Sequence, residues 1–209
     1  MKKALSTVAL AVATLGLHIT ASANLVLNGG FEDVSPAPGV QTQANGTWSI
    51  YNAIAGWTTT AGPGIEVRNN VAGTASEGFN YVELDSTGNT TMSQTLTTSA
   101  GSYYALTFDY SGRAGVAAVS NAIEVLWNNV VVKLNPITAS GIGQGNHVWT
   151  GYSFGVYGSG SDVLSFRSVG TSDSLGGSLD NVRVFSEPGI LASFGLGLLA
   201  LGWTRRRSN

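Results

Sequence analysis

Short runs of alternating apolar residues are the sequence feature that most restricts how this chain can fold. Between residues 104 and 110, Tyr, Leu, Phe and Tyr alternate with Ala, Thr and Asp, and residues 123–127 show the same pattern. A period of two places the apolar side chains on one face of a β-strand. Further candidate strands cover residues 65–67, 80–85, 90–98, 148–157, 163–168 and 178–185. Helical periodicity occurs only near the two ends, so the sequence predicts one all-β domain built as a two-sheet sandwich.

Turn residues separate these runs. An apolar strand over residues 24–27 is expected to end at Asn28-Gly29-Gly30, and residues 35–46, rich in Pro, Gly and Gln, are expected to form an exposed loop. Asn128-Asn129 precedes Val130-Val131-Val132, which predicts a hairpin.

The two ends of the chain have the composition of targeting segments. Lys2-Lys3, an apolar stretch and Ala21-Ser22-Ala23 predict a signal peptide over residues 1–23. At the other end, a Pro-Gly break precedes an apolar run over 190–203, which is shorter than the roughly 20 residues that span a bilayer easily. The sequence therefore predicts a signal peptide (1–23), a β domain (24–185) and a C-terminal tail (186–209).

The tail resembles the PEP-CTERM sorting signal of Gram-negative bacteria. The likeness rests on Ser186-Glu187-Pro188, the glycine-containing apolar run, and the basic cluster Arg205-Arg206-Arg207. It implies transient association with the inner membrane, recognition by an exosortase-type processing enzyme, and export to the cell surface or extracellular matrix. The sequence departs from the family at Ser186, where the usual motif has proline. An ordinary C-terminal membrane tail is the alternative.

Charge and cysteine content narrow the possible partners. Over residues 24–187, the basic residues are Arg68, Arg113, Lys133, Arg167 and Arg183. Against all 12 acidic residues, these five leave a net charge of −7, which argues against binding to nucleic acid or anionic lipid. Neutral ligands, cations and sugars stay open. With no cysteine, an exported domain must be stabilised by packing or by a metal.

Asp180 is the residue that most suggests a metal. It is in phase with Val182 and Val184, which places its carboxylate at the edge of the core. A buried carboxylate needs a cation, an arginine or several hydrogen-bond donors. Ca²⁺ suits carboxylate and carbonyl oxygens, and Glu32 is the expected second ligand. The alternatives are that Asp180 caps a turn or pairs with an arginine.

The order of motifs also resembles galactose-binding-like jelly rolls, many of which are carbohydrate-binding modules. The likeness rests on Asn28-Gly29-Gly30-Phe31-Glu32, Gly56-Trp57, Ser93-Gln94-Thr95-Leu96, Tyr104 to Tyr110, Trp149 and Leu179-Asp180-Asn181-Val182. It implies a single jelly-roll β-sandwich with a structural calcium held by Glu32 and Asp180. The segment from 164 to 180, which includes Asp173, is also similar to surface proteins that carry the sorting signal.

Sugar binding needs an exposed aromatic platform and nearby polar side chains. Trp48 and Tyr51, beside the expected loop, and Tyr81 are the candidate platforms, whereas Trp57, Trp127 and Trp149 are expected in the core. The candidate polar groups are Arg113 and Asp173. Alternatively, Arg113 forms a salt bridge with Asp109 or Asp173.

Catalysis has little support in the sequence. His147 is expected in a solvated loop, and Glu83 and Asp85 are expected on a solvated strand face rather than as a catalytic pair. The motifs of serine hydrolases, zinc proteases and phosphate loops are absent. The sequence therefore predicts a secreted, surface-sorted module that binds carbohydrate and is not an enzyme. The alternative is a structural or self-associating matrix protein without a small ligand.

Overall fold

The computed structural model describes residues 23–36 and 41–186, and this part of the chain contains strands and no helix. It therefore also contains no helix capable of crossing a membrane. Most of the predicted signal peptide, and the tail from Glu187 to Asn209, lie outside the described residues. The last strand includes Ser186, the first residue of the predicted tail.

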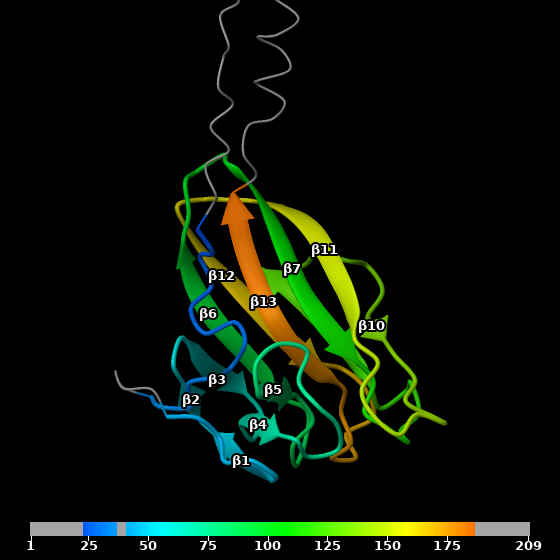
Figure 1. The fold of residues 1–209 in the computed structure, drawn as a ribbon. Helices are drawn as coiled ribbons and strands as arrows, with labels where there is room; N and C mark the ends of the chain where they lie inside the picture. The colour runs from blue at the N-terminus through cyan, green and yellow to red at the C-terminus, as the bar shows by residue number, and fades with distance from the viewer. Residues whose placement is uncertain (1–22, 37–40, 187–209) are drawn as a thin grey trace, which may run out of the picture.

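Two antiparallel sheets stack into a β-sandwich (Figure 1). The six-stranded sheet has the order β1 (Thr47–Tyr51), β4 (Ile65–Asn69), β5 (Asn80–Glu83), β13 (Ser178–Ser186), β7 (Tyr103–Ser111), β11 (Thr150–Tyr157). The seven-stranded sheet has the order β10 (Ile137–Thr138), β8 (Ala122–Trp127), β12 (Ser161–Ser168), β6 (Thr91–Thr97), β3 (Trp57–Ala61), β2 (Ala53–Ile54), with β9 (Val130–Val131) paired to β8. Neighbours in a sheet are often distant in sequence, as in a jelly roll, and the predicted fold class is confirmed.

The core forms where the inner faces of the sheets meet. In β7, Tyr104, Leu106, Phe108 and Tyr110 are buried, as their alternation predicts. Trp57 is fully buried, with its ring 5.8 Å from Phe31 and 6.0 Å from Phe166 between centroids. The expected burial of Trp57 and Trp127 is confirmed, whereas Trp149 is only partly buried.

The predicted β8–β9 hairpin is also confirmed. Asn128 and Asn129 both have positive φ, 52° and 64°, which is the backbone that a tight hairpin of this hand requires.

The expected first strand, residues 24–27, does not form. The segment instead lies beside β13, where the Leu25 amide donates to the Val184 carbonyl at 2.8 Å and the Val184 amide donates to Asn24 Oδ1 at 2.9 Å. A turn then brings Gly29 against the backbone of Val182, whose amide donates to the Gly29 carbonyl at 2.9 Å. The apolar run predicted the right position of the segment but the wrong conformation.

A β-bulge changes the direction of Asp180. The pairing of β13 with β7 shifts register between Asp180 and Arg183, and Asn181 has a φ of 53°. In a regular strand, Asp180 and Val182 would point to the same face. The bulge adds a residue between them, so they point to opposite faces. The carboxylate of Asp180 lies on the outer side of the sheet, where Asp180 is directly opposite Asp109 of β7.

Both faces of β4 and β5 are buried, although only alternate residues face the other sheet. Ile65, Val67 and Val82 belong to the core, whereas Glu83 lies on the outer side and is fully buried. The expectation that Glu83 and Asp85 lie on a solvated face is therefore wrong. Loops cover this part of the outer surface, and sequence alternation does not report such a cover.

We predict that Gly29→Ala destabilises the fold by about 2 kcal/mol or more, because overpacking forces the backbone to move. A Cβ at residue 29 would lie 1.9 Å from the Val182 carbonyl oxygen. Chemical denaturation measures the effect. Gly145→Ala is the matched control, since nothing lies within 4 Å of a Cβ there. Equal stabilities of the two variants would show that Gly29 does not set the position of the N-terminal segment.

Candidate functional site

A loop that we call the strap, residues 71–79, lies over the outer face of the six-stranded sheet. Two carboxylates, the buried Asp180 and the partly buried Glu32, hold its backbone. Asp180 Oδ2 accepts the amides of Ser76 at 2.7 Å and Glu77 at 2.9 Å. At the end of the strap, Glu32 Oε1 accepts the amides of Phe79 at 2.7 Å and Asn80 at 2.8 Å. The two predicted metal ligands thus hold a loop in place.

Glu32 and Asp180 lie close together. A Cβ at Gly30 would lie 4.0 Å both from Asp180 Oδ1 and from Glu32 Cγ. Burial raises the pKa of Asp180 to about 7, and the charge of Glu32 acts in the same direction. In the described part of the chain, no lysine or arginine forms an ion pair with either carboxylate. The same part contains no cluster of three or more His, Cys, Asp or Glu residues suited to a metal.

A second buried acid, Glu83, is held by arginines. Arg68 approaches Glu83 Oε2 at 3.1 Å, and Arg113 Nη1 lies 3.1–3.2 Å from both oxygens of the same carboxylate. Burial raises the pKa of Glu83 to about 8, although both arginines act to lower it. Arg113 was expected to bind ligand from a loop or to pair with Asp109 or Asp173. It pairs with Glu83 instead, because the outer-face loops bring the two residues together.

Tyr81 and His147 form an aromatic cluster beneath the strap. Tyr81 is fully buried and meets the rings of His147 and Trp149 edge to face, at 4.7 Å and 6.0 Å. His147 Nδ1 donates to the Thr74 carbonyl at 2.9 Å, and burial lowers its pKa. Its other ring nitrogen lies 3.0 Å from Ser178 Oγ. An exposed Tyr81 platform and a solvated His147 are therefore both wrong.

The remaining sequence candidates do not converge on one place. Trp48 is 51% exposed, as expected, whereas Tyr51 is partly buried and its hydroxyl donates to Gln43 Oε1 at 2.8 Å. Because the two residues are three apart in β1, they point to opposite faces of the strand. Asp173 is exposed and accepts a 2.7 Å hydrogen bond from the Ser120 hydroxyl. Together these side chains do not line a single site.

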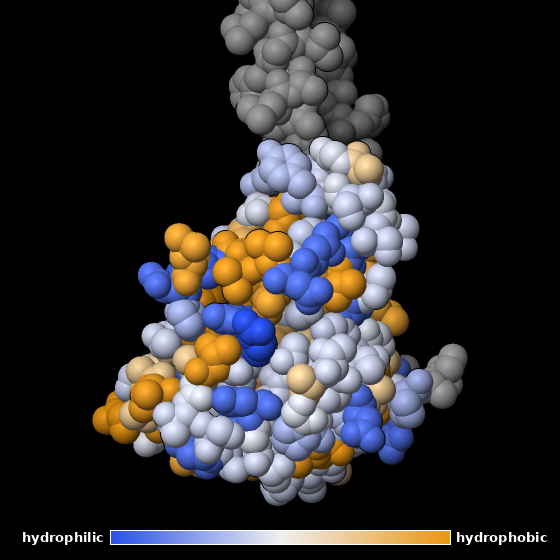
Figure 2. Space-filling view, turned by 180° about the vertical axis from the view of Figure 1, so that it is seen from behind, coloured by the Kyte–Doolittle hydropathy of each residue, from blue (hydrophilic) through white to orange (hydrophobic). Residues whose placement is uncertain are grey.

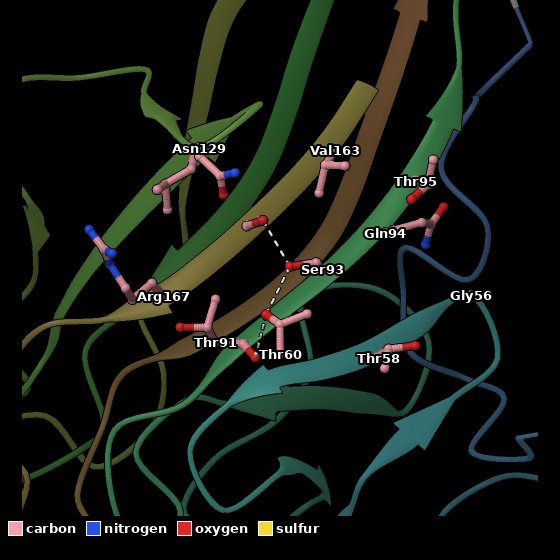
Figure 3. Close-up of a pocket in the computed structure, with 12 residues that line it drawn as sticks. Gly56, Thr58, Thr60, Thr91, Ser93, Gln94, Thr95, Asn129, Val163 and Arg167 are labelled. Carbon is pink, nitrogen blue, oxygen red and sulfur yellow. Dashed lines mark hydrogen bonds between the residues drawn. The ribbon is translucent and has the colours of Figure 1, made fainter. Parts of the chain in front are cut away.

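An open groove lies on the outer face of the other, seven-stranded sheet, with a volume of about 430 Å³ (Figure 3). Six of its twelve lining residues carry hydroxyl groups, on β3, β6 and β12, and we call it the hydroxyl groove. The lining residues are Gly56, Thr58, Thr60, Thr91, Ser93, Gln94, Thr95, Leu126, Asn129, Val163, Ser165 and Arg167. In β6, Met92 and Leu96 are buried on the inner face, so the alternate residues are left to face solvent.

Hydrogen bonds join the hydroxyls across three strands. Ser93 Oγ lies 3.1 Å from Thr60 Oγ1 and 2.8 Å from Ser165 Oγ, as the dashed lines of Figure 3 show. Arg167 is the one charged residue of the lining, and its guanidinium is bonded to Glu124. The groove therefore presents a largely neutral surface rich in hydroxyl groups.

Figure 2 shows the hydropathy of the surface on the opposite side of the molecule from Figure 1. Pale, weakly polar side chains cover much of it, beside a gathering of apolar ones and some strongly polar ones. Sequence reasoning sought an aromatic platform and so missed the groove. The sequence signal for the groove was the alternating set Thr91, Ser93 and Thr95, whose hydroxyls face solvent. That pattern had been used only to predict a strand.

Comparisons with known proteins give likenesses of limited extent. No family model matches the chain. It is 33% identical over 171 residues to a multifunctional-autoprocessing repeats-in-toxin of Vibrio vulnificus, which covers 80% of this chain. A toxin of the same name from Vibrio cholerae is 36% identical over 135 residues, or 63% of this chain. The chain spans only 3% of the length of each of these relatives.

Solved structures of similar fold include carbohydrate-binding modules. A CBM35 from Paenibacillus barcinonensis has a TM-score of 0.43 and 19% identity, and the match covers 68% of this chain and all of that one. TmCBM61, solved with β-1,4-galactotriose, has a TM-score of 0.45 and 18% identity, and the match covers 79% of this chain and all of that one. At these values the likenesses carry no inference about a ligand.

We predict that Arg68→Met destabilises the protein by about 3 kcal/mol, because removing one partner leaves buried carboxylates without compensation. Arg68 bonds both Glu66 and Glu83, and all three side chains are buried. Arg183→Met is the control, since the Arg183–Glu77 pair is about half exposed on both sides, and such pairs contribute little. Urea denaturation compares the two. A loss below about 1 kcal/mol for Arg68→Met would contradict a structural role for this network.

Proposed function

We propose that this domain binds polysaccharide, and that the hydroxyl groove is the binding surface. The observation that carries the proposal is an open groove lined by hydroxyl and amide groups, with Leu126 and Val163 as apolar members. Sugars present both hydroxyls and apolar C–H faces, so a mixed lining of this kind complements them. The groove itself, rather than the likeness to carbohydrate-binding modules, supports the proposal.

The dimensions favour an extended polymer over a single sugar. Most of the lining comes from four neighbouring strands, β8, β12, β6 and β3, which at the usual spacing span about 14 Å. The volume of about 430 Å³ falls within the range of small-ligand sites, but this groove is open to solvent. Hydroxyl-to-hydroxyl bonds such as Ser93–Ser165 hold the donors and acceptors in fixed positions before a ligand arrives.

The lining is suited to binding rather than to hydrolysis. Glycoside hydrolysis uses a pair of carboxylates beside the scissile bond. The groove lining contains neither aspartate, glutamate nor histidine. The buried acids Glu83 and Asp180 lie on the other sheet and are engaged in holding loops. We therefore propose a non-catalytic module.

The proposal places the protein outside a Gram-negative cell. The sequence patterns of residues 1–23 and 186–209 support export, recognition by an exosortase-type enzyme, and transient attachment to the inner membrane. At the cell surface or in the matrix, such a domain would bind exopolysaccharide of its own producer.

We also propose a structural Ca²⁺ at Glu32 and Asp180. The paired carboxylates lack a basic partner in the described part of the chain, and their proximity disfavours two negative charges. A bound cation would compensate both charges and further fix the strap. Backbone carbonyl oxygens and water would complete the ligand set, as is common for Ca²⁺.

We predict that Ca²⁺ raises the melting temperature at pH 7.5 and that Asp180→Asn removes this effect. In chelator, the raised pKa of Asp180 stabilises the protonated folded state at low pH, and this contribution is lost as the pH rises from about 4 to 7. The stability difference between wild type and Asp180→Asn should therefore change across that window. Thermal melts in Ca²⁺ and in chelator check both effects. Identical wild-type melts would rule out the calcium site.

We predict that the double variant Thr60→Val and Thr95→Val weakens polysaccharide binding about tenfold while leaving stability nearly unchanged, because two exposed hydroxyls are lost at constant shape. Affinity electrophoresis against soluble galactan, xylan, mannan, arabinan and the producer's exopolysaccharide measures the change. Thr138→Val, on an exposed residue outside the groove lining, is the control.

The same experiment tests the alternative class of function. If wild type binds none of these polysaccharides, the carbohydrate proposal is wrong. A sedimentation coefficient that also rises with protein concentration would then favour a self-associating structural protein. β11 is a long edge strand, and residues 150–157 contain no charge and no proline. An edge strand of this kind can pair with a strand of another copy, which gives the alternative a physical basis.

A further inference from the structure

We propose that Tyr103 and Tyr157 form a second saccharide subsite, on the outer face of the six-stranded sheet. We call this pair the tyrosine subsite. The inference rests on the proposed function, since it names a second surface for the same class of ligand. Its occupant is a neutral pyranose unit of a polysaccharide, whose apolar face stacks on an aromatic ring.

The two rings are exposed and already in contact. Tyr103 and Tyr157 are directly opposite each other on β7 and β11, and their ring centroids lie 5.3 Å apart with the planes at 66°. Tyr103 is 43% exposed and Tyr157 is 68% exposed. One ring can therefore act as the floor of a subsite and the other as its wall.

Gly155 explains why the ring of Tyr103 can lie low on the sheet. A Cβ at residue 155 would lie 1.9 Å from Tyr103 Oη and 2.5 Å from its Cζ. The phenol therefore crosses the space that any other residue would fill with a side chain. Its underside rests on the strand, while the exposed side faces solvent. A ring held in this way is ordered before binding, which reduces the entropy that a ligand must overcome.

Polar groups lie next along the same face. Thr107 is directly opposite Ser153, and each lies four residues from the tyrosine on its own strand, so all share the outer side. At the usual rise, the distance is about 7 Å per two residues. The Tyr103 ring reaches over Gly155, which is two residues from Ser153, so these hydroxyls suit the rim of a sugar ring stacked on Tyr103. The nearby cation, Arg183, already bonds Glu77 and Asn181, which favours a neutral sugar over an acidic one.

The tyrosine subsite and the hydroxyl groove face opposite directions. The strap is bonded at Asp109 and Asp180, toward the other end of β7 and β13. In Figure 1 the outer surfaces of β7, β13 and β11 face the viewer, and the seven-stranded sheet lies behind them. Since the two surfaces belong to different sheets, one domain could hold two polysaccharide chains and so link them.

Affinity electrophoresis of the full chain in gels containing the same five polysaccharides tests the subsite. We expect Tyr157→Ala and Tyr103→Ala each to weaken binding about tenfold, because the stacking surface is lost. Tyr157→Phe keeps the ring and should bind as wild type. Leu134→Ala removes a side chain that is exposed elsewhere and should also have no effect. Unchanged binding by both tyrosine-to-alanine variants would overturn the inference.

The groove variant separates this inference from the proposed function. If Thr60→Val with Thr95→Val weakens binding and the tyrosine variants do not, the groove stands and the tyrosine subsite is wrong. If both sets weaken binding, mixing wild type with a long polysaccharide should raise light scattering through cross-links. Mixtures of the polysaccharide with a variant of either surface should then scatter less light than the wild-type mixture. Absence of all binding by wild type would reject both proposals.

Discussion

Hydrogen bonds from backbone amides to buried or partly buried carboxylates are the interaction on which the outer layer of this protein depends. Asp180 and Glu32 each bind two amides at or beside the strap, and Glu83 binds the Gly176 amide of another loop. A buried carboxylate is costly unless donors satisfy it, and loop amides are costly unless acceptors satisfy them. Each group removes the penalty of the other, so the loops are fixed without helices or disulfides.

This solution has a consequence for where ligands can bind. The loops that the acids hold cover β4 and β5, so the chemically rich side chains Tyr81, Glu83 and His147 are buried and occupied. What stays open are surfaces that the loops do not reach. On the seven-stranded sheet this is the hydroxyl groove, and on the six-stranded sheet it is the end that carries Tyr103 and Tyr157.

The sequence predicted the sandwich because inward faces obey a period of two, as in β7 and β12. It failed where the structure depends on long-range cover or on local irregularity. The bulge at Asn181 reverses the phase of Asp180, and distant loops bury Glu83 and Tyr81, so neither outcome is visible in a local pattern. The groove escaped notice because serine and threonine on an outer face are also what any solvated strand carries.

The two open surfaces would stabilise a bound sugar through different interactions. Hydroxyl groups in the groove exchange one hydrogen bond with water for one with the ligand, so each gains only about 0.5–1.5 kcal/mol while fixing orientation. Exposed rings of Tyr103 and Tyr157 gain more from contact, because stacking buries apolar area that water otherwise covers. Neither surface alone would bind one sugar unit tightly. A repeating polymer binds more tightly, because one bound unit holds the next units near the protein at a high effective concentration. Retention in a polysaccharide matrix would then arise from many weak contacts on two faces, without a deep pocket.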